Sequence, residues 1–158
     1  MRFSGQVTFS GTAEQAFTLM RTGGGAVTFT ANVSVEYGGT VVTLTNFTGQ
    51  ETEFGSLRDG RYTLTALSSQ ISAGGQALDG DANGSPGGNY VFGDQQGLFR
   101  FFGDINGDRH VDIADFGLFS SSIFNPANYI AGFDFNHDGV IDIADFGQFS
   151  IRIFTPLP

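Results

Sequence analysis

The second half of the chain contains a long internal repeat. Residues 104–124 (DINGDRHVDIADFGLFSSSIF) recur as residues 134–154 (DFNHDGVIDIADFGQFSIRIF), and 13 of the 21 aligned positions are identical. A repeat constrains the fold strongly, because each copy must form the same small unit and neighbouring copies then pack together. Each copy opens with Asp, Asn and Gly residues and continues with Phe and Ile at helical spacing. The sequence therefore predicts a loop followed by a helix, twice.

The polar residues of both copies fit one twelve-residue loop, counted from Asp104 and from Asp134. Side-chain oxygens fall at positions 1, 3, 5, 9 and 12, which is the ligand spacing of a calcium loop, where position 7 adds a backbone carbonyl. The predicted ligands are Asp104, Asn106, Asp108, His110, Asp112 and Asp115 for one ion, and Asp134, Asn136, Asp138, Val140, Asp142 and Asp145 for the other. Two aligned copies, each followed by the same helical pattern, favour calcium binding over a solvated polar turn.

Positions 6 and 8 of the loops carry further expectations. Position 6 requires a residue that tolerates positive φ, and Gly139 meets this need in the second copy. Arg109 in the first copy should cost about 1 kcal/mol of strain, so we expect the second loop to be better formed. Position 8 is apolar in both copies (Val111 and Ile141), which predicts a strand-like contact between the two loops.

The motif Asp-x-Asn-x-Asp, followed by an apolar residue, Asp-Ile-Ala-Asp-Phe and a short helix, covers residues 104–154 twice over, and this stretch resembles a dockerin. Dockerins are pairs of loop–helix halves of EF-hands. The resemblance implies two calcium ions, a secreted bacterial protein and often a cohesin partner held by the helix surfaces. The chain departs from cohesin-binding dockerins at Ala114 and Ala144, where many of them carry a hydroxyl, and its only basic helix residue is Arg152.

Each predicted helix carries one apolar stripe. The first helix should run from 113 to 123, with Phe116, Phe119 and Ile123 on one side and Phe124 beside them. The second copy repeats this pattern with Phe146, Phe149, Ile153 and Phe154. Such stripes are more often core than a partner groove, so we expect these side chains to be buried.

Residues 1–93 show the alternation and turns of strands. The clearest strand covers 26–37, where Val27, Phe29, Ala31, Val33 and Val35 share one face. Gly38-Gly39 then predicts a hairpin into a strand over 40–47. Shorter strands are expected at 3–9, 16–20, 60–71 and 90–92, and a loop or helical turn at 49–59. These elements predict an antiparallel β-sandwich. The pattern AFTL…TVVTL…DGRYTLTAL…ALDGD resembles bacterial immunoglobulin-like domains, which implies a spacer or adhesion module.

The stretch between these parts, residues 94–103 (DQQGLFRFFG), is short and apolar. Leu98, Phe99, Phe101 and Phe102 would be costly to leave in water, so we expect a packed linker between a sandwich at 1–93 and a small α domain at 104–158.

A third polar loop lies ahead of the linker. Asp79, Asp81 and Asn83 occupy positions 1, 3 and 5 with Gly84 at position 6, whereas positions 9 and 12 carry no carboxylate. A surface turn and a third calcium site, completed by Asn89 or Asp94, both remain open for this loop.

Charge and composition limit the functions of the chain. Of the 16 acidic residues, eight lie in the two repeat loops, and two calcium ions would reduce the net charge from −9 to −5. Seven scattered arginines and no lysine give no basic surface for nucleic acid. There is no cysteine for disulfides or thiol chemistry, no apolar run of membrane-spanning length and no signal-peptide pattern at the start.

Both histidines, His110 and His137, lie in the repeat loops, and the acids of residues 1–93 are sparse, so we expect no enzyme. The sequence predicts a monomeric, non-catalytic calcium-binding module, namely the C-terminal structural or anchoring part of a larger secreted or cell-surface bacterial protein. The alternative is a docking module that binds a cohesin-like partner through the repeat helices.

Overall fold

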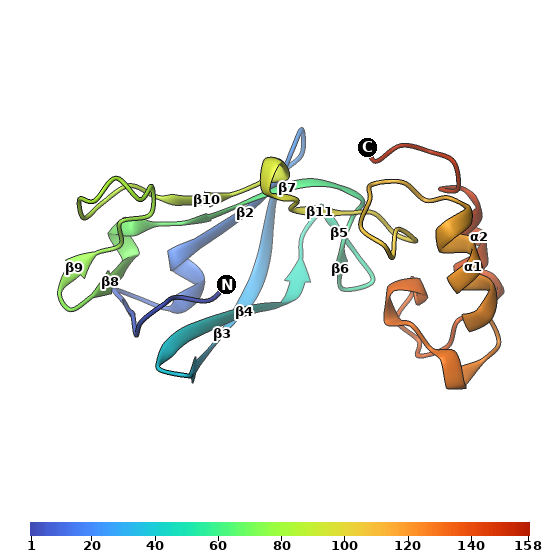
Figure 1. The fold of residues 1–158 in the computed structure, drawn as a ribbon, viewed down its shortest axis with the longest axis horizontal. Helices are drawn as coiled ribbons and strands as arrows, with labels where there is room; N and C mark the ends of the chain where they lie inside the picture. Colours follow the sequence, from blue (N-terminus) through green and yellow to red (C-terminus); the bar gives the residue numbers. More distant parts are fainter. The chain divides into compact units, whose positions relative to one another are not determined.

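A computed structural model describes residues 1–158. The protein is mainly β, with antiparallel strands and two α-helices (Figure 1). It divides into two compact units. The first comprises residues 1–57 and 61–99, and the second comprises residues 58–60 and 100–158. The short segment 58–60 therefore belongs to the second unit although its sequence neighbours on both sides belong to the first.

The largest sheet is built around a long hairpin. Its path is β10–β7–β2–β3–β4, with β11 paired to β7. The bounds are β2 (Phe17–Arg21), β3 (Ala26–Glu36), β4 (Gly39–Thr48), β7 (Gly60–Ala66), β10 (Tyr90–Phe92) and β11 (Phe99–Arg100). Tyr37 and Gly38 both take positive φ between β3 and β4, as a two-residue hairpin turn requires. The alternating pattern thus predicted each end of β3 and of β4 to within one residue.

Two smaller sheets complete the first unit. The strands β1 (Thr8–Phe9), β8 (Ile71–Ala73) and β9 (Gln76–Ala77) form one, and β5 (Thr52–Glu53) pairs with β6 (Ser56–Leu57) in the other. The single strand expected over 60–71 is wrong, since β7 ends at Ala66, the 3-10 turn η2 (Ser68–Gln70) follows, and Ile71 opens β8 in a different sheet.

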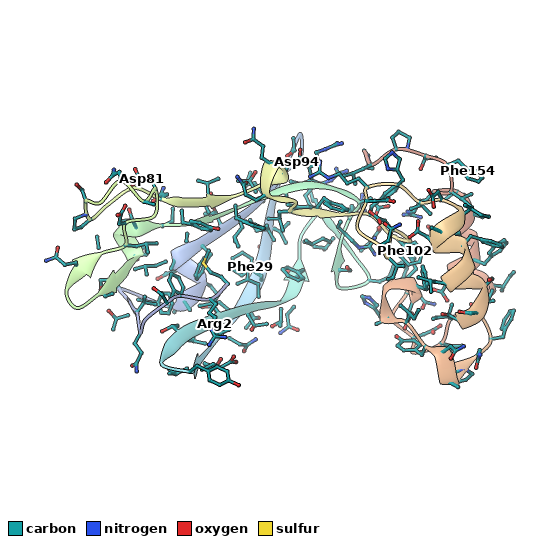
Figure 2. The ribbon with its side chains drawn as sticks, in the orientation of Figure 1. Arg2, Phe29, Asp81, Asp94, Phe102 and Phe154 are labelled. Atoms are coloured by element: carbon teal, nitrogen blue, oxygen red, sulfur yellow. The ribbon has the colours of Figure 1, made fainter.

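The core of the first unit draws on both the large sheet and the three-stranded sheet. Phe17, Phe29 and Tyr62 come from the large sheet and Ile71 comes from β8 (Phe29 is labelled in Figure 2). Burial along β3 stops part-way. Val27 and Phe29 are buried, but Val33 and Val35 are exposed, because the outer half of the hairpin lies beyond the core. The apolar face predicted for this strand is therefore buried at its first half and exposed at its distal end.

A carboxylate accepts a hydrogen bond from β3 at a position that its neighbour β2 does not reach. Strand β2 pairs with β3 only at Ala26 and Val27. Further along, the Ala31 amide donates to Glu14 Oε1 at 2.9 Å, from the 3-10 turn η1 (Ala13–Ala16). Glu14 thereby satisfies an amide of β3 that lies beyond the residues paired with β2.

In the second unit, the two helices start at equivalent aspartates. The helix α1 (Ile113–Ser122) is capped by Asp112 and α2 (Ile143–Ser150) by Asp142, and each cap forms a capping box with the Asp three residues later. Short 3-10 turns, η4 (Pro126–Asn128) and η5 (Ala131–Phe133), connect the two copies. No helix of the protein combines the length and apolar character needed to cross a membrane.

The two copies pack through equivalent residues. The rings of Phe119 and Phe149 stack with centroids 4.7 Å apart, and both are buried. Phe133 meets both rings edge-on, at 5.2 and 6.0 Å. The expected burial of the helix stripes is therefore correct for Phe119 and Phe149 but wrong for Phe146, which is 36% exposed.

The loops and helix ends interlock across the repeat. The Phe124 amide donates to the carbonyl of Ile141 at 2.9 Å, and the Phe154 amide donates to that of Val111 at 2.7 Å. The position-8 residues Val111 and Ile141 are buried, but their carbonyls bond the end of the other copy's helix, so the strand-like contact predicted between the two loops is wrong for these bonds. Phe124 and Phe154 take positive φ and their rings are 68% and 75% exposed, so their predicted burial is wrong. Figure 2 shows Phe154 at the outside of this unit.

The second unit also contains a largely buried ion cluster around Asp59. Its carboxylate accepts hydrogen bonds from Arg100 Nη1 (2.7 Å), from the Phe102 amide (2.7 Å) and from Arg152 Nε (2.5 Å). The Arg152 guanidinium lies over the rings of Phe102 and Phe135, which themselves contact edge-to-face at 5.0 Å. Of the apolar residues in the predicted linker, Phe102 is therefore core of the second unit, while Leu98 packs on the core of the first.

Candidate metal centre

Each predicted loop winds around the carboxylate at its first position. Asp104 accepts hydrogen bonds from the amides of Gly107, Asp108 and Arg109 at 2.7–3.1 Å. Asp134 accepts from the corresponding amides of Asp138 (3.2 Å) and Gly139 (2.9 Å). The same residue types at the same spacing therefore give the same local winding in both copies.

Positions 3 and 5 of each loop are joined to each other. Asn106 donates through Nδ2 to Asp108 Oδ2 at 3.0 Å and accepts from the Asp108 amide at 2.9 Å. Asn136 and Asp138 form the matching pair at 2.8 and 3.2 Å. The carboxylate at position 5 then accepts the amide of position 7, which is His110 or Val140, at 2.9 Å in both loops. Position 7 is thus folded against position 5.

The carboxylates at position 12 are the most buried groups of the loops. Asp115 and Asp145 are both 0% exposed. Asp115 accepts the amides of Ile105 and Asp112 at 3.0 Å each, and Asp145 accepts those of Phe135 (2.7 Å) and Asp142 (2.9 Å). These amides hold position 12 against positions 2 and 9, and all of them are neutral donors.

Position 9 is occupied by the helix N-caps. Asp112 accepts the amide of Ala114 at 2.8 Å, and Asp142 accepts that of Ala144 at 2.7 Å. Helix capping accounts for these bonds without an ion. It does not account for the buried acidic groups Asp115, Asp134 and Asp145.

Positive φ occurs at positions 4 and 6 of both loops, which changes the expected difference between them. Position 4 is Gly107 (φ 77°) in the first loop and His137 (φ 57°) in the second. Position 6 is Arg109 (φ 72°) and Gly139 (φ 86°), respectively. Each loop therefore has one glycine and one strained residue, at about 1 kcal/mol each. Strain at Arg109 alone does not favour the second loop.

The first carboxylates of the two loops lie in different surroundings. Burial raises the pKa of Asp104 above its ordinary value, against the lowering effect of the amides that it accepts, and the charge of Asp115 adds to the rise. Asp134 is 2% exposed and accepts a further bond from the Tyr129 hydroxyl at 2.7 Å. This hydrogen bond is the main reason that the pKa of Tyr129 rises to about 12. The hydroxyl therefore stays protonated, and stays a donor, up to strongly alkaline pH.

The donor set of each loop consists of oxygen atoms of the kind that calcium requires. No three Asp, Glu or His side chains group closely enough to hold a metal by themselves. The predicted set, however, includes an asparagine oxygen and a backbone carbonyl, and water completes such sites. A carboxylate has about four lone-pair sites, so accepting amide bonds leaves capacity for an ion. All predicted ligands are oxygen donors, the type that calcium prefers.

The third polar loop repeats only half of this winding. Asp79 accepts the amides of Asn83 (3.1 Å) and Gly84 (2.9 Å), and Asn83 Nδ2 donates to Asp81 at 3.0 Å. Asp81 is labelled in Figure 2, in the loop before β10. Asn89, one of the two residues expected to complete a calcium site here, instead accepts a hydrogen bond from the amide of Ser68 at 3.0 Å. The other such residue, Asp94, forms an ion pair with Arg61 at 3.4 Å.

Two residues that contact charged groups of the second unit lie outside the repeated motif, so the motif did not indicate them. Tyr129 lies between the copies, five residues before Asp134, and Asp59 lies 93 residues before Arg152. Comparison of the chain with protein-family models, with characterised proteins and with solved structures finds no match.

Proposed function

We propose that this chain is a non-catalytic calcium-binding module in which the second unit is a dockerin-like pair of loop–helix repeats and the first an immunoglobulin-like sandwich. Each repeat loop binds one calcium ion through positions 1, 3, 5, 7, 9 and 12. The module serves as a structural or anchoring part of a larger secreted or cell-surface bacterial protein. Millimolar extracellular calcium suits sites of this kind.

The observation that carries this proposal is the pair of fully buried carboxylates, Asp115 and Asp145. Both are 0% exposed, and their hydrogen bonds come only from neutral amides. Buried charges in proteins are normally paired or bound to metal. Each lies in one loop with a second acidic group at position 1, Asp104 or Asp134, so the two loops concentrate negative charge that a divalent cation would neutralise.

Metal binding is then linked to folding of the second unit. Bound calcium would supply the positive charge that the loops lack. The chain supplies the rest: position 12 fixes the start of each helix, and the helix positions Phe119 or Phe149 for the stack at the centre of the unit. An ion that binds only the folded loops stabilises the fold by mass action.

Isothermal titration of the calcium-free chain with calcium tests the proposal. We expect two ions per chain, and one ion after Asp115→Asn or Asp145→Asn. Asp81→Asn in the third polar loop is the matched control and should leave the number of ions unchanged. Absence of heat and of bound calcium in the unmodified chain at millimolar calcium would refute the proposal.

A docking role is the second candidate, and exposed apolar residues favour it. Ile113 and Ile143 are equivalent in the repeat and equally exposed. Phe124 and Phe154 are also equivalent and both exposed, and Ile151 adds to this set. A hollow of about 500 Å³ beside the second loop is lined in part by Phe124, Tyr129 and Val140. Arg152, in contrast, is held by Asp59 and by Gln148, so it is not available to a cohesin-like partner.

Retention of a secreted protein on the immobilised chain separates the two candidates. Binding that is lost in a Phe124→Ser, Phe154→Ser double variant would support docking. Sedimentation of the chain as a monomer with no retained partner would leave the structural role.

A further inference from the structure

The two repeat loops differ in one contact that the sequence repeat does not copy. Their backbones carry equal strain, with one glycine and one other residue at positive φ in each. Their first, third, fifth, ninth and twelfth positions are identical residues. Any difference in affinity between the loops must therefore come from groups outside the twelve positions or from the positions that do not ligate.

Tyr129 is such a group. Its hydroxyl donates to Asp134 Oδ2 at 2.7 Å, from the segment that connects the copies. The residue at the same offset before the first loop is Phe99, which has no hydroxyl to donate. Asp134 is fully enclosed, whereas Asp104 is only half-buried. The second loop therefore holds its first carboxylate by backbone amides and a side chain, and the first loop holds it by amides alone.

We propose that Tyr129 positions Asp134 for calcium and thereby makes the second loop the tighter of the two sites, which fills first. The inference rests on the proposed calcium function. A hydrogen bond to a metal-ligating carboxylate fixes its orientation, and loss of such a partner typically lowers metal affinity by about 10- to 100-fold. Tyr129 is a positioning residue here, because it contacts the ligand and not the ion.

Single-site variants isolate the effect. Asp104→Asn leaves the second loop to bind calcium, and Asp134→Asn leaves the first. We expect Tyr129→Phe to weaken calcium binding about 10- to 100-fold in the Asp104→Asn chain and to leave binding unchanged in the Asp134→Asn chain. Tyr37→Phe, at an exposed tyrosine of the first unit, is the matched control and should change neither value.

Terbium titration gives a second readout in the otherwise unmodified chain. The chain has no tryptophan, and its four tyrosines are Tyr37, Tyr62, Tyr90 and Tyr129, of which only Tyr129 lies in the second unit. Tyrosine-sensitised terbium emission should therefore rise with the first equivalent and disappear in Tyr129→Phe. Emission that rises only with the second equivalent would overturn the filling order.

The outcomes distinguish this inference from the proposed function. If the unmodified chain binds neither calcium nor terbium, the calcium function itself fails. If it binds two ions but Tyr129→Phe weakens both single-site chains equally, the tyrosine has only a general structural role and the inference fails. If it weakens neither, Asp134 needs no positioning and the inference fails as well.

Discussion

At the scale of single residues, the carboxylates at position 12 decide how stable each repeat is. Asp145 accepts two amides at once, from Phe135 and Asp142. In Asp145→Asn, one of these amides must face the side-chain NH₂ group, which cannot accept. We expect a loss of about 1–3 kcal/mol even without calcium, because a buried donor is left unsatisfied.

Hydrogen exchange of the α2 amides in the presence of chelator measures this loss. Asp81→Asn is the control, since Asp81 is exposed, and should change stability by no more than about 0.5 kcal/mol. Equal protection of α2 in the Asp145→Asn chain and the unmodified chain would show that Asp145 is held only weakly.

Glu14 makes the stability of the first unit depend on pH. The amide of Ala31, which Glu14 accepts, is the main reason that the pKa of Glu14 lies below its model-compound value of 4.5. A carboxyl whose pKa is lower in the folded state stabilises the fold above the unfolded value, and this contribution is lost as pH falls through the folded value. Glu14→Gln should therefore flatten the fall of stability below about pH 4.5.

Urea unfolding of both chains between neutral pH and about pH 3 tests this prediction. The midpoints should differ at neutral pH and converge in acid. Parallel curves over the whole range would show that the Ala31–Glu14 hydrogen bond does not depend on the charge.

At the scale of elements, the second unit depends on a segment from far away in the chain. Asp59 joins Arg100, just before the first repeat, to Arg152, just after the second helix. All three side chains are largely buried, between 12% and 19% exposed. In Asp59→Asn, two guanidinium groups lose their carboxylate, so we expect the second unit to lose about 2–3 kcal/mol, discounted from the value for a fully buried pair.

The Arg61–Asp94 pair offers a matched control. It is longer, at 3.4 Å, and its side chains are 35% and 37% exposed. Asp94→Asn should cost at most about 1 kcal/mol, as exposed pairs do. Thermal unfolding of the two variants compares them directly, and an equal loss would refute a special role of Asp59.

Elements that depend on neighbouring residues were predictable from sequence, and those that depend on distant ones were not. The alternation in β3 and the Asp spacing of the loops are local patterns, and so the hairpin, both helix starts and the winding of both loops could be predicted. Asp59 meets Arg152 across 93 residues, and Tyr129 lies outside the repeated motif, so no local pattern marks either contact. The exposure of Phe124 and Phe154 follows from the backbone turn after each helix, which composition does not encode.

At the scale of the whole molecule, the repeat places much of the acidic charge at the starting points of both helices. Half of the 16 acidic residues lie in the two loops, in a chain of net charge −9. The loops are also the starting points of both helices and hence of the aromatic core. If the loops bind calcium as proposed, removing it should act on the second unit as a whole and not on the loops alone.

Calorimetry in about 2 mM calcium and in excess chelator tests this coupling. If calcium binds with a dissociation constant of about 0.1–1 mM, mass action gives about 0.6–1.8 kcal/mol per ion. Two ions should then raise the midpoint of the second unit by roughly 5–30 °C, given its small size. In the Asp115→Asn, Asp145→Asn double variant this shift should vanish. Its loss identifies the calcium-dependent transition as the unfolding of the second unit. A shift that persists in the double variant would mean that calcium stabilises the protein at some other place, and the role of the repeat loops would have to be abandoned.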